Sequence, residues 1–124
     1  MGKLPHPVEY QEEHLDDIKK AIEDARFGAE ALAVVKYGDL DPADTCGFAW
    51  VSLTPDFKGN TKIGKRERKV FEALGARKDW TERRWQIWCP TNTQSINIKE
   101  LVCDHICEHL RPFGFTAHTG SNVD

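Results

Sequence analysis

Residues 46–53 read Cys-Gly-Phe-Ala-Trp-Val-Ser-Leu, and this short stretch decides the fold class. It is aromatic and β-branched, and Thr54-Pro55-Asp56 closes it, as is typical of a β-strand. Its lack of alternating polar residues predicts burial on both faces. The sequence therefore predicts a sheet that contains this strand.

The segment before this strand is mainly helical. Apolar residues recur at helical spacing from Glu9 to about Val35, and Phe27-Gly28 could interrupt the helix. Residues 31–37 fit either the end of that helix or a short buried strand. Residues 38–44, with their glycine and proline, predict a loop.

The segment after this strand begins with a helix that has clear boundary signals. Asn60 or Thr61 can cap it, and Gly75 is a natural stop, so we expect a helix over residues 62–74. Residues 85–89 then form a second strand, which Pro90 ends.

The last third of the chain repeats this alternation. Asn97 followed by Glu100 resembles a capping box and predicts a helix that runs to about Arg111. A third short strand is expected over residues 115–118, and the end of the chain is a polar tail.

The order of helices and strands predicts an α/β fold. We expect a small sheet of three to four strands in β-α-β order with an additional N-terminal helix. An α+β two-layer sandwich with an antiparallel pair is the close alternative. The length of 124 residues suits a single domain. Its expected parts are an N-terminal tail (1–8), a mainly helical segment (9–36), an alternating core (46–119) and a C-terminal tail (120–124).

Composition excludes several classes of protein. Hydrophobic residues make up 40% of the chain and include four Trp and six Phe, so a disordered chain is not expected. The longest apolar run, residues 31–35, is far too short to cross a bilayer, so no membrane partner is predicted. No secretory signal is visible in the first residues.

The net charge of −3 hides a basic block inside an acidic chain. Residues 1–57 hold five Lys and Arg against twelve Asp and Glu. Residues 58–84 hold ten against four, and residues 85–124 hold two against four. A local excess of positive charge of this kind favours an anionic partner.

The basic block supplies the candidate binding site. Four cations share one face of the helix at 62–74, and four more surround an aromatic residue in the following loop. Basic side chains around an aromatic ring suit a phosphate backbone and a stacked base. The predicted site comprises Lys58, Asn60, Thr61, Lys62, Lys65, Arg66, Lys69, Arg77, Lys78, Trp80, Arg83 and Arg84. The alternatives are a solvated helix face and a face covered by the acidic first helix.

The start of the same helix could bind an anion. Residues 59–65 have the Gly-x4-Gly-Lys spacing of a phosphate-binding loop, but Arg66 stands where a Ser or Thr would hold magnesium. A nucleotide triphosphatase is therefore not expected. Backbone N–H groups with Lys62 and Lys65 remain a plausible anion site.

The four cysteines do not predict a catalytic or metal site. Cys103 and Cys107 share a helix face with apolar residues and suit the core, and the alternative is a zinc site with His105, His109 or His118. Cys46 opens the central strand, where packing suits it better than a catalytic pairing with a histidine. We predict no catalytic residues, no cofactor and no metal, and the balance is against an enzyme.

Acidic residues flank the central strand as well. Asp41, Asp44 and Asp56 could gather a cation, although acidic residues in loops are usually solvated.

Several motifs resemble small uncharacterised proteins of tailed bacteriophages. These are Asp-Thr-Cys-Gly-Phe-Ala-Trp-Val at 44–51, Asn-Thr-Lys-Ile-Gly-Lys at 60–65, Trp-Cys-Pro at 88–90 followed by Gln94, and Gly-Ser-Asn-Val-Asp at 120–124. The resemblance covers roughly residues 30–124. Cys89 departs from the Asn that the family has before this proline, and Asn122-Val123 departs from its Arg-Leu. The resemblance implies a phage accessory protein in the host cytoplasm, or a virion component, and no particular activity.

Three functional hypotheses follow from these patterns. The first is a non-enzymatic binding module that meets a nucleic acid or an acidic protein through residues 58–84. The second is a structural or assembly protein that forms a homo-oligomer, because four Trp are much aromatic surface for so small a monomer. The third is an anion- or nucleotide-binding protein that uses the helix start at 60–65.

Overall fold

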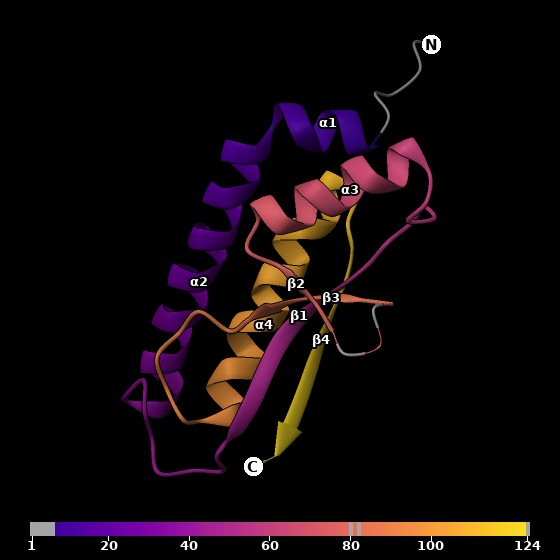
Figure 1. Ribbon diagram of the computed structural model, residues 1–124. Coiled ribbons are helices and arrows are strands. Elements are labelled where there is room, and N and C mark those ends of the chain that lie inside the picture. Colours follow the sequence, from indigo (N-terminus) through magenta and orange to yellow (C-terminus); the bar gives the residue numbers. More distant parts are fainter. Residues whose placement is uncertain (1–6, 80, 82, 124) are drawn as a thin grey trace.

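The computed structural model describes residues 7–79, 81 and 83–123 (Figure 1). Its helices are α1 (Pro7–Glu13), α2 (Leu15–Tyr37), α3 (Lys62–Ala73) and α4 (Ile96–Leu110), and a 3-10 turn (Arg111–Phe113) follows α4. Its strands are β1 (Gly47–Thr54), β2 (Arg77–Lys78), β3 (Trp85–Trp88) and β4 (Thr116–Val123).

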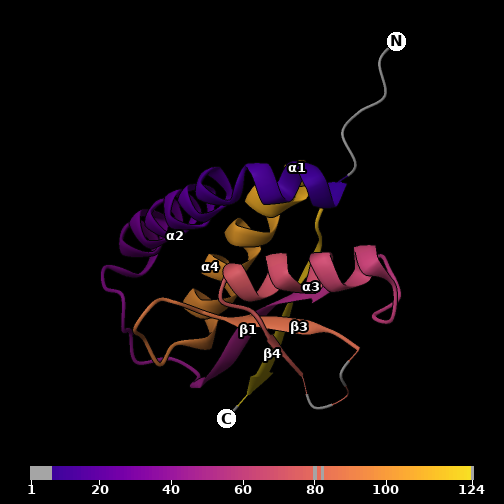
Figure 2. The same cartoon turned by 45° about the horizontal axis from the view of Figure 1, so that its top comes forward.

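The strands form one sheet in the order β2-β3-β1-β4, and each neighbouring pair is antiparallel. The expected small sheet with an additional N-terminal helix is confirmed. Of the two arrangements, the structure has the α+β one, because antiparallel neighbours are not joined by parallel β-α-β crossovers. Figure 2 shows α1 and α2 as an outer layer, with α3 and α4 between them and the sheet.

The inner face of β1 is fully buried, but its outer face is only partly covered, which corrects the prediction of burial on both: Trp50 is half-buried there and Ser52 is buried. Ala49, Val51 and Leu53 point into the core and are almost inaccessible to solvent. Phe48 alternates with them on the other face and is 49% exposed. The run lacks polar alternation because aromatic residues occupy the open face.

Two helices cover the buried face of the sheet. Helix α4 contributes Ile98, Val102 and Ile106, and helix α2 packs on α4 from outside. From α3, Phe71 is 2% exposed, and its ring lies 5.9 Å from that of Trp85 and 6.2 Å from that of Phe115. Phe71 therefore joins α3 to the sheet.

The N-terminal segment is two helices with a break at His14, not at Phe27-Gly28. Residues 31–37 are helical, which settles the helix-or-strand ambiguity. Gly38 ends α2 in the left-handed conformation (φ 76°) that glycine adopts without steric cost. Among the described residues, no helix is both long enough and apolar enough to cross a membrane.

The helix starts show where local signals sufficed. Thr61 caps α3 as predicted, since its Oγ1 accepts the N–H of Gly64 at 3.0 Å. Helix α4 begins earlier than predicted, because Ser95 and not Asn97 is its cap. The Ser95 Oγ accepts the N–H of Ile98 at 3.2 Å and donates to Asp44 at 2.7 Å, so a contact distant in sequence fixes this cap.

Two strands differ from the sequence prediction. The last strand runs through Val123, so most of the expected polar tail pairs with β1 as an edge strand. The two-residue strand β2 was not predicted, because both of its side chains are exposed and carry no apolar pattern. It pairs with β3 in antiparallel register, and the two strands form the β2–β3 hairpin.

Candidate functional site

The predicted basic face of α3 is open except at one position. Lys62, Lys65 and Lys69 are exposed. Arg66 instead donates two hydrogen bonds to the carboxylate of Glu12 in α1, one of them 3.1 Å long. The acidic first helix therefore covers part of this face, and Arg66 serves to dock α1 onto α3.

The titration of this pair agrees with that role. The hydrogen bond from Arg66 is the largest cause of a lowered pKa of Glu12, and the same bond raises the pKa of Arg66. Both groups are accessible to water, which screens their attraction. We therefore expect this ion pair to orient α1 on α3 and to contribute little to the free energy of unfolding.

The phosphate-loop spacing of residues 59–65 has a packing explanation. A Cβ on Gly64 would lie 1.8 Å from the carbonyl oxygen of Lys58, so a side chain is sterically excluded there. Thr61 also donates its hydroxyl to that carbonyl at 2.7 Å. The Lys58 carbonyl and the Thr61 side chain therefore occupy part of the helix start that was predicted to bind an anion. Lys62 and Lys65 remain exposed beside it.

The β2–β3 hairpin holds the second predicted group of cations. Arg77, Lys78, Arg83 and Arg84 are all exposed, and the structure shows no ion pair for them within the residues it describes. The N–H of Asp79 donates to the Arg84 carbonyl at 2.9 Å and closes the hairpin. Trp80, the aromatic residue predicted among them, lies outside the described residues.

The open face of the sheet carries an aromatic cluster that the sequence analysis did not single out. Trp50 and Trp88 are cross-strand partners, with ring centroids 5.4 Å apart. The ring of Phe48 lies 6.3 Å from that of Trp88 in an edge-on arrangement. Trp88 is 52% exposed and Phe48 nearly as much. The signal that could have found them is alternation, which places 48 and 50 on one face once residues 49, 51 and 53 are in the core.

Strand β4, on the other side of β1 from β3, leaves room for the aromatic cluster. Gly120 is the cross-strand partner of Trp50, and a Cβ at Gly120 would come within 2.4 Å of the indole. The indole therefore lies over the backbone of β4. Gly120 belongs to the predicted tail, so its role depends on strand pairing that the sequence did not reveal.

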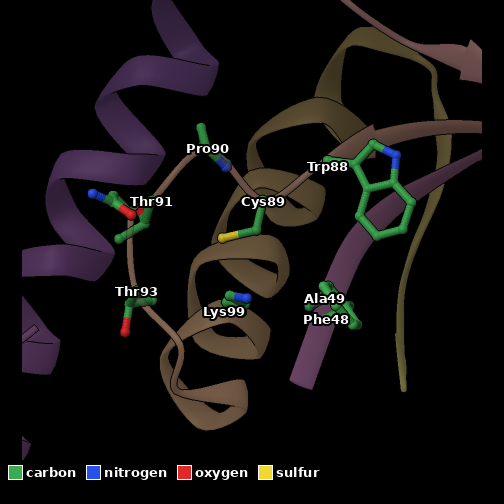
Figure 3. Close-up of a pocket in the computed structure, with 9 residues that line it drawn as sticks. Phe48, Ala49, Trp88, Cys89, Pro90, Thr91, Thr93 and Lys99 are labelled. Carbon is green, nitrogen blue, oxygen red and sulfur yellow. The ribbon is translucent and has the colours of Figure 1, made fainter. Parts of the chain in front are cut away.

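A cavity of about 380 Å³ adjoins the aromatic cluster where β3 ends (Figure 3). Phe48 and Trp88 line one part of it, and Cys89, Thr91 and Lys99 line another. The ammonium group of Lys99 donates to the carbonyl of Gly47 at 2.7 Å and lies 5.2 Å from the centre of the Phe48 ring. A cation therefore stands beside the exposed aromatic rings.

Cys89 is half-buried in this cavity and has an altered acidity. A hydrogen bond from the thiol of Cys103, the N–H of Thr91 and the charge of Lys99 together lower the pKa of Cys89 to about 7, against the opposing effect of burial. The pKa of Cys103 is raised, because Cys89 takes its hydrogen bond and burial disfavours a second thiolate.

We expect Cys89 to react with iodoacetamide at a rate that is half-maximal near pH 7, because the thiolate is the nucleophile. Mass spectrometry of a Cys46→Ser protein, which lacks the exposed thiol of Cys46, measures this rate across pH. Cys103→Ala removes the hydrogen bond and should move the midpoint upward. A midpoint at or above about 8.5, the value for a free cysteine, contradicts the assignment.

The other cysteines divide into two classes. Cys103 and Cys107 are buried on the inner face of α4, so the prediction of two core thiols is confirmed. Cys46 is exposed, which corrects its expected role in packing, because it precedes the first core residue of β1. No group of three or more His, Cys, Asp and Glu that could hold a metal ion occurs among the described residues.

The three aspartates around β1 brace its two ends: Asp41 and Asp44 both hold residues 93–97, and Asp56 holds the start of β4. Asp41 accepts the N–H of Gln94 at 2.9 Å, Asp44 is bound by Ser95, and Asp56 accepts the hydroxyl of Thr116 at 3.3 Å. They attach the ends of β1 to neighbouring segments and do not converge on one cation.

Comparison with known proteins gives this chain no relative. No protein-family model, no curated protein and no solved structure matches it.

Proposed function

We propose that this chain is a non-enzymatic binding module for nucleic acid, whose phosphates contact the basic block of residues 58–84 through the exposed cations of the β2–β3 hairpin. One observation carries the proposal: the exposed cations of the β2–β3 hairpin adjoin an open sheet face that bears exposed aromatic rings. Phosphates bind cationic side chains and bases stack on aromatic rings. A surface that has both cations and exposed aromatic rings therefore suits a nucleic acid. An acidic protein would use the cations and leave the rings unexplained.

The resemblance to tailed-bacteriophage proteins adds a proposed setting. We take the chain to be a phage accessory protein that acts in the host cytoplasm. The motifs that carry this resemblance include β1, which bears Phe48 and Trp50, and the end of β4, whose Gly120 pairs with Trp50.

Fluorescence anisotropy with a labelled oligonucleotide of about 12 nucleotides tests the proposed function at about 50 and about 200 mM salt. If four hairpin cations contact phosphates, affinity should fall about 50-fold over this range. The double variant Arg83→Gln/Arg84→Gln should lower the salt slope by about 1.4, because each phosphate contact on a single strand contributes about 0.7.

The matched control is Lys19→Gln/Lys20→Gln, which removes the same charge from the exposed side of α2. It should leave the salt slope unchanged. Absence of binding to any nucleic acid at low salt would end the proposal. Equal affinity for polyglutamate would assign the basic surface to an acidic protein instead.

A second candidate function, a homo-oligomer, is favoured by exposed apolar side chains of α2. Phe27, Leu32, Val34 and Val35 are all exposed on this helix. Exposed apolar surface often marks protein–protein contacts. Light scattering distinguishes this candidate, since the mass of one chain at all concentrations excludes it.

A further inference from the structure

We infer that the open face of the sheet binds single-stranded nucleic acid, with unpaired bases stacked on Phe48, Trp50 and Trp88. This inference rests on the proposed function and deepens it, because it names the form of nucleic acid and the surface that reads it. Neither the basic hairpin nor the charge pattern of the sequence distinguishes a single strand from a duplex.

The ring geometry supports stacking of more than one base. The rings of Trp50 and Trp88 are inclined by 59°, and those of Phe48 and Trp88 by 84°. In an edge-on or tilted pair the two rings do not cover each other face to face, so each ring keeps a face that its partner does not cover. The cluster therefore offers several separate stacking surfaces along β1 and β3.

Cations on and beside this face can hold the phosphates between those bases. Arg77 is the cross-strand partner of Gln86, so its side chain is placed on the open face with Gln86 and Trp88. On the other side of the cluster, Lys99 lies 5.2 Å from the Phe48 ring centre. Positively charged groups thus lie on both sides of the aromatic cluster. Cations complement phosphates and aromatic rings complement bases, so the expected ligand is a polyanion that carries bases.

The row across the sheet next to the cluster is polar. Gln86 and His118 share a register row with Arg77 and are accessible, whereas Ser52 between them is buried. Amide and imidazole groups can hydrogen-bond the edges of unpaired bases. An apolar protein partner would leave these groups desolvated, which disfavours it.

A duplex cannot use this face in the same way. Its bases are stacked on each other and paired, so exposed rings on a sheet find only its backbone and groove edges. Stacking on protein aromatics requires bases that are free to splay, as in single strands and loops. The face therefore predicts a preference for single strands over duplex of equal length.

The test measures binding of single-stranded and duplex oligonucleotides of equal length by anisotropy, with tryptophan quenching recorded alongside. Phe48→Ala and Trp88→Ala should each weaken single-strand binding by about 5- to 150-fold. Their salt slope should stay that of the original protein, because no phosphate contact is lost. The matched control is Phe27→Ala, which removes an exposed ring from α2 and should leave single-strand binding unchanged.

A milder variant tests the same face through a positioning residue. Gly120→Ala should displace the indole of Trp50, weaken single-strand binding and reduce the tryptophan quenching at saturation, while the salt slope again stays constant. It keeps the inference testable if an aromatic variant fails to fold, which circular dichroism shows beforehand.

The outcomes separate this inference from the proposed function. If no nucleic acid binds, both fail. If nucleic acid binds with the expected salt dependence but Phe48→Ala and Trp88→Ala bind as tightly as the original protein, the stacking face is wrong and the basic surface stands. A duplex that binds at least as tightly as the single strand overturns the inference in the same way.

Discussion

Replacement of Phe71 by alanine should lower the free energy of unfolding by about 3–5 kcal/mol. The ring is almost fully buried and contacts the rings of Trp85 and Phe115, which belong to β3 and the entry to β4. Its removal would leave a cavity where α3 meets the sheet, and the surrounding rings are too large to close it fully.

Urea unfolding followed by circular dichroism measures this loss. Phe27→Ala is the matched control, because that ring is 62% exposed, and its substitution should change stability by about 0.5 kcal/mol or less. A loss below about 1 kcal/mol for Phe71→Ala would mean that α3 is not anchored through this residue.

The elements that could be predicted from the sequence are those whose signals are local. The strand that begins at Gly47 is bounded by a proline turn, and α3 has both a cap at Thr61 and a stop at Gly75. These residues act within a few positions of themselves, so their effect can be read without knowing the rest of the fold.

The elements that could not be predicted depend on partners distant in sequence. Residues 119–123 are polar and read as a tail, yet they form a strand because β1 supplies their hydrogen-bond partners. Ser95 outcompetes Asn97 as a cap because Asp44 holds its hydroxyl group. In both places the deciding contact spans about fifty residues or more.

In the candidate site, too, the residues with local signals were predicted, and those that depend on distant contacts were not. The hairpin cations were predicted as individual residues, because charge is visible in the sequence. Arg66 was grouped with its neighbours, and only the docking of α1 shows that Glu12 occupies it. The aromatic face was not predicted because the run at 46–53 lacks alternating polar residues, and only the placement of the helices on one side of the sheet leaves Phe48, and Trp88 on the neighbouring strand, exposed.

The second large effect is expected for Glu67→Ala, with a loss of about 2–4 kcal/mol in the free energy of unfolding. Residue Glu67 is 3% exposed, and its carboxylate accepts the N–H groups of Asp56 at 2.9 Å and Phe57 at 3.2 Å, which fixes the chain as it leaves β1. Burial raises the pKa of Glu67, so the substitution also removes the cost of a buried charge. We therefore expect a smaller loss of unfolding free energy than for Phe71→Ala.

Glu72→Ala, an exposed position on the same helix, is the control in urea unfolding at neutral pH. Equal stability of the two glutamate variants would show that the loop after β1 is held by other contacts.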